Sequence, residues 1–270
     1  MNKKLLLGII SVLVLAVFIF LIIRKINIPV RIKGGKITSA AALSAKALDI
    51  SKTGDLLGAK AIYQLLISDF PNSNDIINWQ KNVEDINIKL LFSSAITPKS
   101  ILYEIKPGDT LAKIAKEFKT TPELIAKSNG LKDDKIFLGK KIKVWTAPFS
   151  ILVDKSQNTL ILKTDEEIIK TYIVSTGLNN STPVGTFKII NKLPNPTWFK
   201  AGAVVSPDSP NNVLGSRWMG FDLPGYGIHG TIEPQNLGKQ VTQGCVRMAN
   251  SDVEELYTIV PVGTEVTIVD

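Results

Sequence analysis

The chain has 270 residues and a formal net charge of +8 at pH 7, from 32 Lys and Arg residues against 24 Asp and Glu residues. This length is too great for one small domain and suits two or three modules. One cysteine excludes an intrachain disulfide, and one histidine with one cysteine is too few of the usual ligands for a zinc site unless carboxylates complete it. We therefore expect no metal and no cofactor. The basic charge suits anionic partners, but no nucleic-acid-binding motif accompanies it, so no nucleic-acid partner is expected.

The first recognisable element is an uncharged apolar run of nineteen residues at positions 5–23. As a helix it would be about 28 Å long, close to the thickness of the hydrocarbon core of a bilayer. Arg24 and Lys25 follow where a signal peptide would place small residues for cleavage. We therefore predict an uncleaved transmembrane anchor over residues 1–24, with a cleaved signal peptide as the alternative.

Residues 38–93 are predicted to form two or three helices. Apolar residues recur near helical spacing at Leu56, Leu57, Ala61, Leu65 and Leu66. The segment 55–71 is similar to a tetratricopeptide helix pair, although the period is not clearly repeated. We interpret the segment as a helical, tetratricopeptide-like hairpin that acts as a spacer or docks a protein partner.

Residues 101–146 have the pattern of a strand, two helices and a second strand. Thr121 and Pro122 suit the N-cap and the first position of the second helix. The strings 103–111 (YEIKPGDTL) and 128–131 (SNGL) resemble a LysM domain over nearly its full length. This resemblance implies binding to glycans that contain N-acetylglucosamine, such as peptidoglycan strands. A folded spacer without a working glycan groove is the alternative.

Residues 149–270 are predicted to be rich in β-strands. Apolar runs divided by polar turns occur at 151–153, 160–162, 168–174, 187–190 and 265–269. Ser251 and Glu254 form a capping-box pattern at the start of a helix. The proline-rich stretch 191–212 surrounds Trp198 and is interpreted as an irregular flap that grips the substrate. The alternative is that its aromatic residues pack into the core.

The only histidine and the only cysteine lie in two glycine-rich strings, 226–231 (YGIHGT) and 242–248 (TQGCVRM). A thiol reacts as the thiolate and needs a nearby base, and imidazole serves that role near neutral pH. We therefore predict Cys245 as a nucleophile and His229 as its base. The amides of Gly244 and Cys245 are candidates to hold an oxyanion. A buried structural cysteine beside a core histidine is the alternative.

These strings resemble the signature of the L,D-transpeptidase family, also called the YkuD or ErfK family. The resemblance runs from residue 149 to residue 270 and includes 153–157, 175–177, 182–187 and 214–220. Members commonly carry a second histidine directly before the Gly-Cys pair, where this chain has Gln243. The resemblance implies a fold like a β-sandwich.

The resemblance also implies a mechanism. Cys245, activated by His229, attacks the carbonyl at the L-centre of diaminopimelate in a donor tetrapeptide stem and expels the terminal D-alanine. The thioacyl enzyme then passes the donor to the side-chain amine of a second stem, which gives a 3→3 cross-link. The carbonyl of Gly230 orients the imidazole. The predicted substrate-binding residues are Arg247, Gln243, Tyr226 and Trp198, with a surface ion pair as the alternative role of Arg247.

Other functions remain open at this stage. Water or a free D-amino acid as the acceptor would make the protein an L,D-carboxypeptidase or an exchange enzyme. Outside the enzymes, it would be a wall-binding anchor whose helical hairpin recruits partners. The expected partners are peptidoglycan stem peptides and glycan strands, the membrane through the N-terminal helix, and a protein bound by the hairpin.

The charges that flank the apolar run bear on localisation. Five basic residues follow the run within thirteen positions and two precede it, which favours a cytoplasmic body by the positive-inside rule. Both modules, however, resemble modules that act on the cell wall. We therefore predict a single-pass protein of the cell membrane whose catalytic body is extracytoplasmic.

Overall fold

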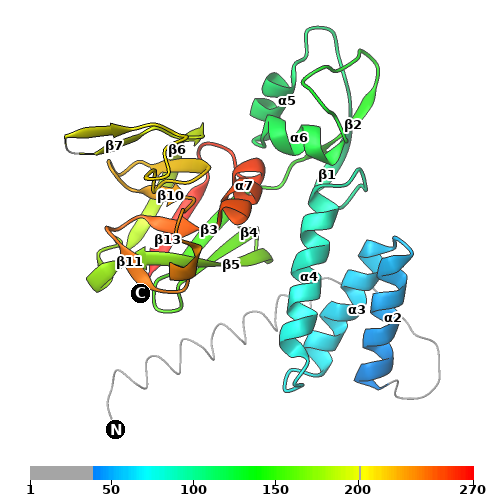
Figure 1. Ribbon diagram of the computed structural model, residues 1–270. Coiled ribbons are helices and arrows are strands. Elements are labelled where there is room, and N and C mark those ends of the chain that lie inside the picture. The colour runs from blue at the N-terminus through cyan, green and yellow to red at the C-terminus, as the bar shows by residue number, and fades with distance from the viewer. Residues whose placement is uncertain (1–38, 201) are drawn as a thin grey trace. The chain divides into compact units, whose positions relative to one another are not determined.

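The computed structural model describes residues 39–200 and 202–270 (Figure 1). The predicted anchor over residues 1–24 lies outside the described residues. Within them, no helix has the length and the apolar character needed to cross a membrane. The chain runs from a group of helices into a small unit of strands and helices, and then into a domain made mostly of strands.

The positive charge of the chain is concentrated before the described part. Residues 1–37 contain seven Lys and Arg residues and no Asp or Glu, whereas the rest of the chain contains 25 basic and 24 acidic residues. Residues 149–270 contain nine basic and twelve acidic residues. The catalytic domain therefore does not carry the net charge of +8. This charge does not give the domain a general attraction for anionic wall polymers.

The predicted helical segment contains three helices, the larger of the two predicted numbers and one more than a simple hairpin has. The three are α2 (Ala40–Lys52), α3 (Leu56–Asp69) and α4 (Ile76–Leu91). Asp55 caps α3 by accepting a hydrogen bond from the backbone N–H of Gly58 at 2.8 Å. The buried side chains of Tyr63, Leu66 and Trp79 fill the space between the helices. The third helix gives this module a core of its own.

The LysM-like unit has the predicted order of strand, helix, helix and strand. Its elements are β1 (Ser100–Glu104), α5 (Leu111–Phe118), α6 (Pro122–Ser128) and β2 (Lys141–Trp145). The two strands pair antiparallel, with Tyr103 opposite Ile142. The Thr121 hydroxyl accepts a hydrogen bond from the backbone N–H of Leu124 at 2.9 Å, so Thr121 is the N-cap of α6.

The strand-rich domain is built on one mixed sheet of nine strands. In sheet order these are β11 (Gln240–Thr242), β5 (Glu167–Gly177), β12 (Val246–Met248), β10 (Gly227–His229), β9 (Arg217–Phe221), β6 (Gly185–Pro194), β13 (Glu265–Val269), β3 (Phe149–Asp154) and β4 (Thr159–Thr164). β5 pairs with β4 through its first part and with β12 and β11 near its end. β6 likewise pairs first with β13 and then with β9.

These two long strands therefore belong to both faces of the domain, and the pairing of β4 with β5 closes the sheet on itself. The core between the faces is apolar and includes Leu160, Ile189, Met219 and Val246. The β-rich catalytic fold is thus as predicted, but the two halves of the predicted sandwich are continuous through shared strands.

Two local predictions differ from the structure. The stretch 191–212 is not irregular throughout, because β7 (Trp198–Lys200) and β8 (Ala203–Val205) form an antiparallel hairpin within it. The helix α7 (Asn250–Ile259) begins one residue before Ser251, with Ala249 at the N-cap and no side-chain capping bond. The predicted capping box is therefore wrong, since Ser251 lies inside the first turn.

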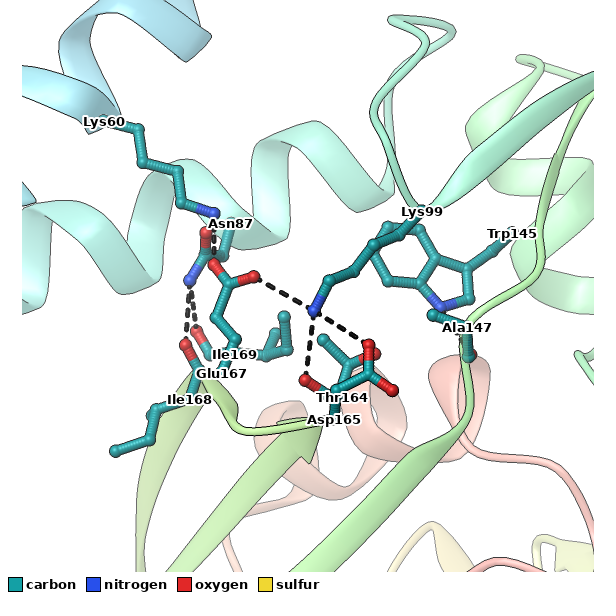
Figure 2. Close-up of polar contacts among 10 residues, drawn as sticks. All are labelled: Lys60, Asn87, Lys99, Trp145, Ala147, Thr164, Asp165, Glu167, Ile168 and Ile169. Atoms are coloured by element: carbon teal, nitrogen blue, oxygen red, sulfur yellow. Dashed lines mark hydrogen bonds and ion pairs between the residues drawn. The ribbon is translucent and has the colours of Figure 1, made fainter. Parts of the chain in front are cut away.

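Polar contacts join the helices to the strand-rich domain (Figure 2). The side-chain amide of Asn87 in α4 donates to the carbonyls of Ile168 and Ile169 in β5, at 3.1 and 3.2 Å. Glu167, at the start of β5, forms ion pairs with Lys60 and, at 3.2 Å, with Lys99. One face of the helical module is thus occupied by the chain's own catalytic domain, which leaves less surface for a protein partner.

Candidate active site

Cys245 lies in the short turn between β11 and β12, and this turn depends on glycine. Gly244 has a φ of +129°, and a Cβ atom there would lie 2.6 Å from Cε1 of Tyr226. The Thr242 hydroxyl accepts a hydrogen bond from the Gly244 N–H at 3.2 Å and donates one to the Cys245 carbonyl at 2.7 Å. Of the two amides predicted to hold an oxyanion, that of Gly244 is therefore already engaged within the turn.

His229 ends β10, which is the neighbour of β12 in the sheet. The parallel pairing of these strands sets His229 opposite Arg247, two residues after the cysteine. The imidazole is buried, with 3% of the residue exposed, and it stacks on the Trp218 ring with 5.9 Å between ring centroids. Its Nδ1 lies 2.7 Å from the Gly230 carbonyl oxygen. Because a carbonyl only accepts, we assign the ring proton to Nδ1, which leaves Nε2 as the basic nitrogen.

The environment keeps both reactive side chains neutral at neutral pH. Burial lowers the pKa of His229 to about 4, although hydrogen bonds to the backbone of Gly230 and Leu214 act in the opposite direction. Burial also raises the pKa of the Cys245 thiol, although a backbone hydrogen bond from Gly227 and the charge of Arg247 act in the opposite direction. The resting site therefore contains a thiol and a neutral imidazole rather than an ion pair.

The thiol does not point at the imidazole in this structure. Cys245 Sγ donates to the carbonyl of Gly225, with 3.5 Å between sulfur and oxygen. Among the described residues, no hydrogen bond joins Sγ to the His229 ring. Cys245 directly precedes β12, and His229 ends the neighbouring strand β10. Apo enzymes often hold their catalytic groups in such loosely aligned geometry.

A cavity of about 640 Å³ brings most of the predicted site residues together. Those that line it are Trp198, Tyr226, His229, Gln243, Cys245 and Arg247. Gly230 and Gly244, which were also predicted as site residues, do not line it. Trp198 and Phe199 of the β7–β8 hairpin also line the cavity. Phe199 is largely exposed, so the alternative in which both aromatic residues pack into the core is wrong.

Arg247 is held in place at the edge of this cavity. Its guanidinium donates to the Glu233 carboxylate at 2.8 Å, while its buried Nε has no hydrogen-bond partner among the described residues. The ion pair considered as an alternative role is thus present.

Several residues that shape the site were not predicted. Thr242 braces the turn that carries the nucleophile, and Trp218 covers the imidazole. Asn250 bonds to the backbone on both sides of Thr231, directly after the histidine string. Thr242 is the first residue of the cysteine string and Asn250 follows the string by two positions, so hydrogen-bonding residues at and just beyond its ends were the available signal.

Comparison with known proteins identifies the two domains. Residues 148–268 match the family model of the L,D-transpeptidase catalytic domain, and residues 103–145 match that of the LysM domain. A Bacillus licheniformis protein named L,D-transpeptidase YkuD is 36% identical over 176 residues, covering 62% of this chain and 98% of that protein. A Bacillus subtilis protein named L,D-transpeptidase YqjB is 40% identical over 126 residues, covering 44% of this chain and 70% of that protein.

A solved structure of an L,D-transpeptidase from Mycobacterium smegmatis is similar at 20% identity with a TM-score of 0.39, covering 49% of this chain and 64% of that one. The sequence matches define a modular protein in which a LysM domain precedes a β-rich catalytic domain. The chain belongs to the YkuD family of L,D-transpeptidases. Both resemblances drawn from the sequence are thereby confirmed, and α2, α3 and α4 lie outside the segments matched by the two family models.

Proposed function

We propose that this protein is a peptidoglycan L,D-transpeptidase that forms 3→3 cross-links through a thioacyl intermediate on Cys245. The observation that carries the proposal is that the only thiol of the chain, just before β12, and the only imidazole, at the end of the neighbouring strand β10, line one cavity. Membership of the YkuD family supplies the class of reaction. The geometry supports a specific order of steps.

In the first half of the reaction, the thiol turns from the Gly225 carbonyl to Nε2 of His229 and gives up its proton. The thiolate attacks the carbonyl at the L-centre of diaminopimelate in the donor stem. The Cys245 N–H holds the oxyanion, because the Gly244 N–H is bound by Thr242. The imidazolium then protonates the departing amine of D-alanine, which leaves a thioester and a neutral base.

In the second half, the side-chain amine of diaminopimelate on another stem enters the cavity. His229 accepts a proton from this amine as it attacks the thioester, and Cys245 leaves as thiolate and is reprotonated. A pKa of about 4 suits this cycle, since the imidazole is neutral and able to accept a proton at the start of each half. Water or a D-amino acid in place of the amine would give the carboxypeptidase or the exchange reaction.

The proposal also covers targeting and localisation. The LysM domain holds the protein on glycan strands, residues 1–24 anchor it in the membrane, and the catalytic body lies outside the cytoplasm. Binding to purified sacculi at low and at moderate salt tests the first part, because salt weakens nonspecific adsorption. Protease digestion of the body in intact spheroplasts tests the topology, and full protection would contradict it.

The reaction is tested by incubating the full chain in detergent with purified disaccharide tetrapeptides and analysing the products by mass spectrometry. We expect dimers linked 3→3 that are absent with Cys245→Ala. Ser94→Ala, at an exposed position between α4 and β1 and outside the predicted machinery, serves as the matched control. Tripeptides alone would identify a carboxypeptidase, and D-amino-acid exchange products an exchange enzyme. Unchanged substrate would favour the anchor function.

A further inference from the structure

We propose that Asn250 is a positioning residue for the catalytic base and that it acts through the peptide group between Gly230 and Thr231. The inference rests on the proposed role of His229 as the base. The Gly230 carbonyl oxygen accepts the Nδ1–H of His229 at 2.7 Å. The N–H at the other end of that same peptide group, from Thr231, donates to Asn250 Oδ1 at 3.1 Å.

A peptide group is planar, so a bond that fixes its N–H also fixes the direction of its carbonyl. Asn250 makes two further bonds that hold this plane: Nδ2 donates to the Thr231 carbonyl at 2.9 Å, and Oδ1 accepts the Ser216 N–H at 3.2 Å. Hydrogen bonds in such a chain polarise one another. The bond that the Thr231 N–H donates to Asn250 Oδ1 therefore strengthens the Gly230 carbonyl as the acceptor that keeps the proton of His229 on Nδ1.

Packing around the amide indicates that its place is closely defined. A Cβ atom on Gly230 would lie 2.2 Å from Asn250 Oδ1, and one on Gly215 would lie 2.3 Å from it. Both glycines thus leave room for this one oxygen to reach the backbone. Gly215 also has a φ of +63°, a conformation that favours glycine. Two backbone segments far apart in sequence are joined at the side chain of Asn250.

The plainer interpretation is that Asn250 only secures the start of α7. Two observations argue against it. The N-cap of α7 is Ala249, and the helix has no side-chain capping bond, so the Asn250 amide is directed at the histidine segment rather than at its own helix. The residue is solvent-exposed overall and does not line the catalytic cavity. Its side-chain hydrogen bonds run to the backbone of Ser216 and Thr231.

The single histidine allows a direct test that needs no substrate. With ¹⁵N-labelled histidine in the full chain, the ring signals come from His229 alone and report which nitrogen carries the proton. At pH 7 we expect one tautomer, protonated at Nδ1, in the native protein and a mixture of tautomers in Asn250→Ala. Asn250→Asp keeps the acceptor for Thr231 and Ser216 but loses the donor, so its ring should remain mostly in the native tautomer.

The single cysteine gives a second readout. The rate of alkylation of Cys245 by iodoacetamide at pH 7 should fall about 3- to 10-fold in Asn250→Ala, the range expected for loss of one hydrogen bond, and less in Asn250→Asp. Ser251→Ala, the next exposed residue of α7, is the matched control and should leave both readouts unchanged.

Unfolding in urea is measured alongside to separate positioning from stability. Native tautomer and native alkylation in a folded Asn250→Ala would overturn the proposal, even if that variant were less stable. If Asn250→Ala does not fold, Asn250→Asp provides the test. The proposal would also be overturned if the folded Asn250→Asp variant had the same mixture of histidine tautomers as the unfolded chain. If native Cys245 reacts no faster than the cysteine of the denatured chain, the proposal that Cys245 is the nucleophile is wrong. The tautomer measurement does not depend on the reactivity of Cys245, so it tests the Asn250 inference separately.

Discussion

A basic side chain is buried at the junction between the modules, and another is buried at the active site. The two side chains differ in their hydrogen bonds. At the junction, Lys143 of β2 is 1% exposed, and its Nζ donates to the carbonyls of Leu90 at 2.5 Å and of Ser93 at 2.8 Å. At the candidate active site, His229 is 3% exposed, and its Nδ1 bonds to the Gly230 carbonyl. Burial lowers both pKa values, to about 8 and about 4.

The difference separates structural burial from functional burial. A buried group whose hydrogen bonds are made within the protein holds elements together, as Lys143 holds the strand β2 to the end of α4. A buried group that keeps one polar atom for a substrate costs stability and contributes activity. Substitution at the junction should therefore change the free energy of unfolding, whereas substitution at the site should change turnover.

The largest expected effect is a loss of activity without a loss of stability. Cys245→Ala removes the proposed nucleophile, and we expect formation of cross-linked dimers to fall by at least about 10³-fold. Unfolding in urea should change little, because the hydrogen bonds of the thiol are weak, one to the Gly225 carbonyl at 3.5 Å and one from the Gly227 backbone. Product analysis by mass spectrometry and a urea titration check the two halves of this expectation. Substantial turnover without the thiol would mean that the site is misassigned.

The second effect is a loss of stability in acid that originates at His229. Its pKa of about 4 in the folded state is below the unfolded value of about 6.5, so between these values the unfolded chain binds more protons. The free energy of unfolding should therefore fall as pH drops through this window, by about 3 kcal/mol from this residue. Urea titrations from pH 7 to pH 4 measure the loss.

Carboxylates also titrate in that window, so the control is the difference between two proteins. His229→Gln keeps a polar side chain but cannot gain the proton, and its stability should fall less steeply in acid than that of the native protein. Parallel acid profiles for the two proteins would mean that the imidazole is not the buried neutral base that its surroundings indicate.

The third effect is a change of stability in the alkaline pH range, and it originates at Lys143 in the junction. Lys143 has a folded pKa of about 8 against about 10.5 unfolded, so the folded state again binds fewer protons in between. The free energy of unfolding should rise between pH 8 and pH 10, by about 2 kcal/mol from this side chain. Lys143→Met should remove that rise, and Lys141→Met, at an exposed position of the same strand, should retain it.

What could be predicted from the sequence depends on how far apart the partners lie. The cap of α6 was predicted because Thr121 and the amide it binds are three residues apart, within one helical turn. Asn250 was missed because its partners lie 19 and 34 positions away, where no local pattern indicates contact. The start of α7 was misplaced because Ser251 and Glu254 fit a capping box in sequence, yet the chain enters the helix one residue earlier.

The same reasoning applies within the site. Cys245 and His229 were predicted from their chemistry and from the family strings, and the structure brings both to one cavity. The engagement of the Gly244 amide by Thr242 was not predicted, because a hydroxyl two residues away can equally face solvent. The hairpin of β7 and β8 was missed because three-residue strands are too short for an alternating pattern to be recognised.

The smallest expected effect tests whether the helices are part of the same folded unit as the catalytic domain. Asn87→Ala removes the two hydrogen bonds to β5 and should lower the free energy of unfolding by about 1 kcal/mol, since the better helix propensity of alanine offsets part of the loss. Gln80→Ala, an exposed amide on the same helix, is the control and should be close to neutral. Turnover per folded molecule should be unchanged in both variants, because Asn87 contacts the first residues of β5 and the site lies at the other end of that strand, where β11 and β12 pair with it. A loss of turnover with intact stability would instead make the helical module a regulator of the site.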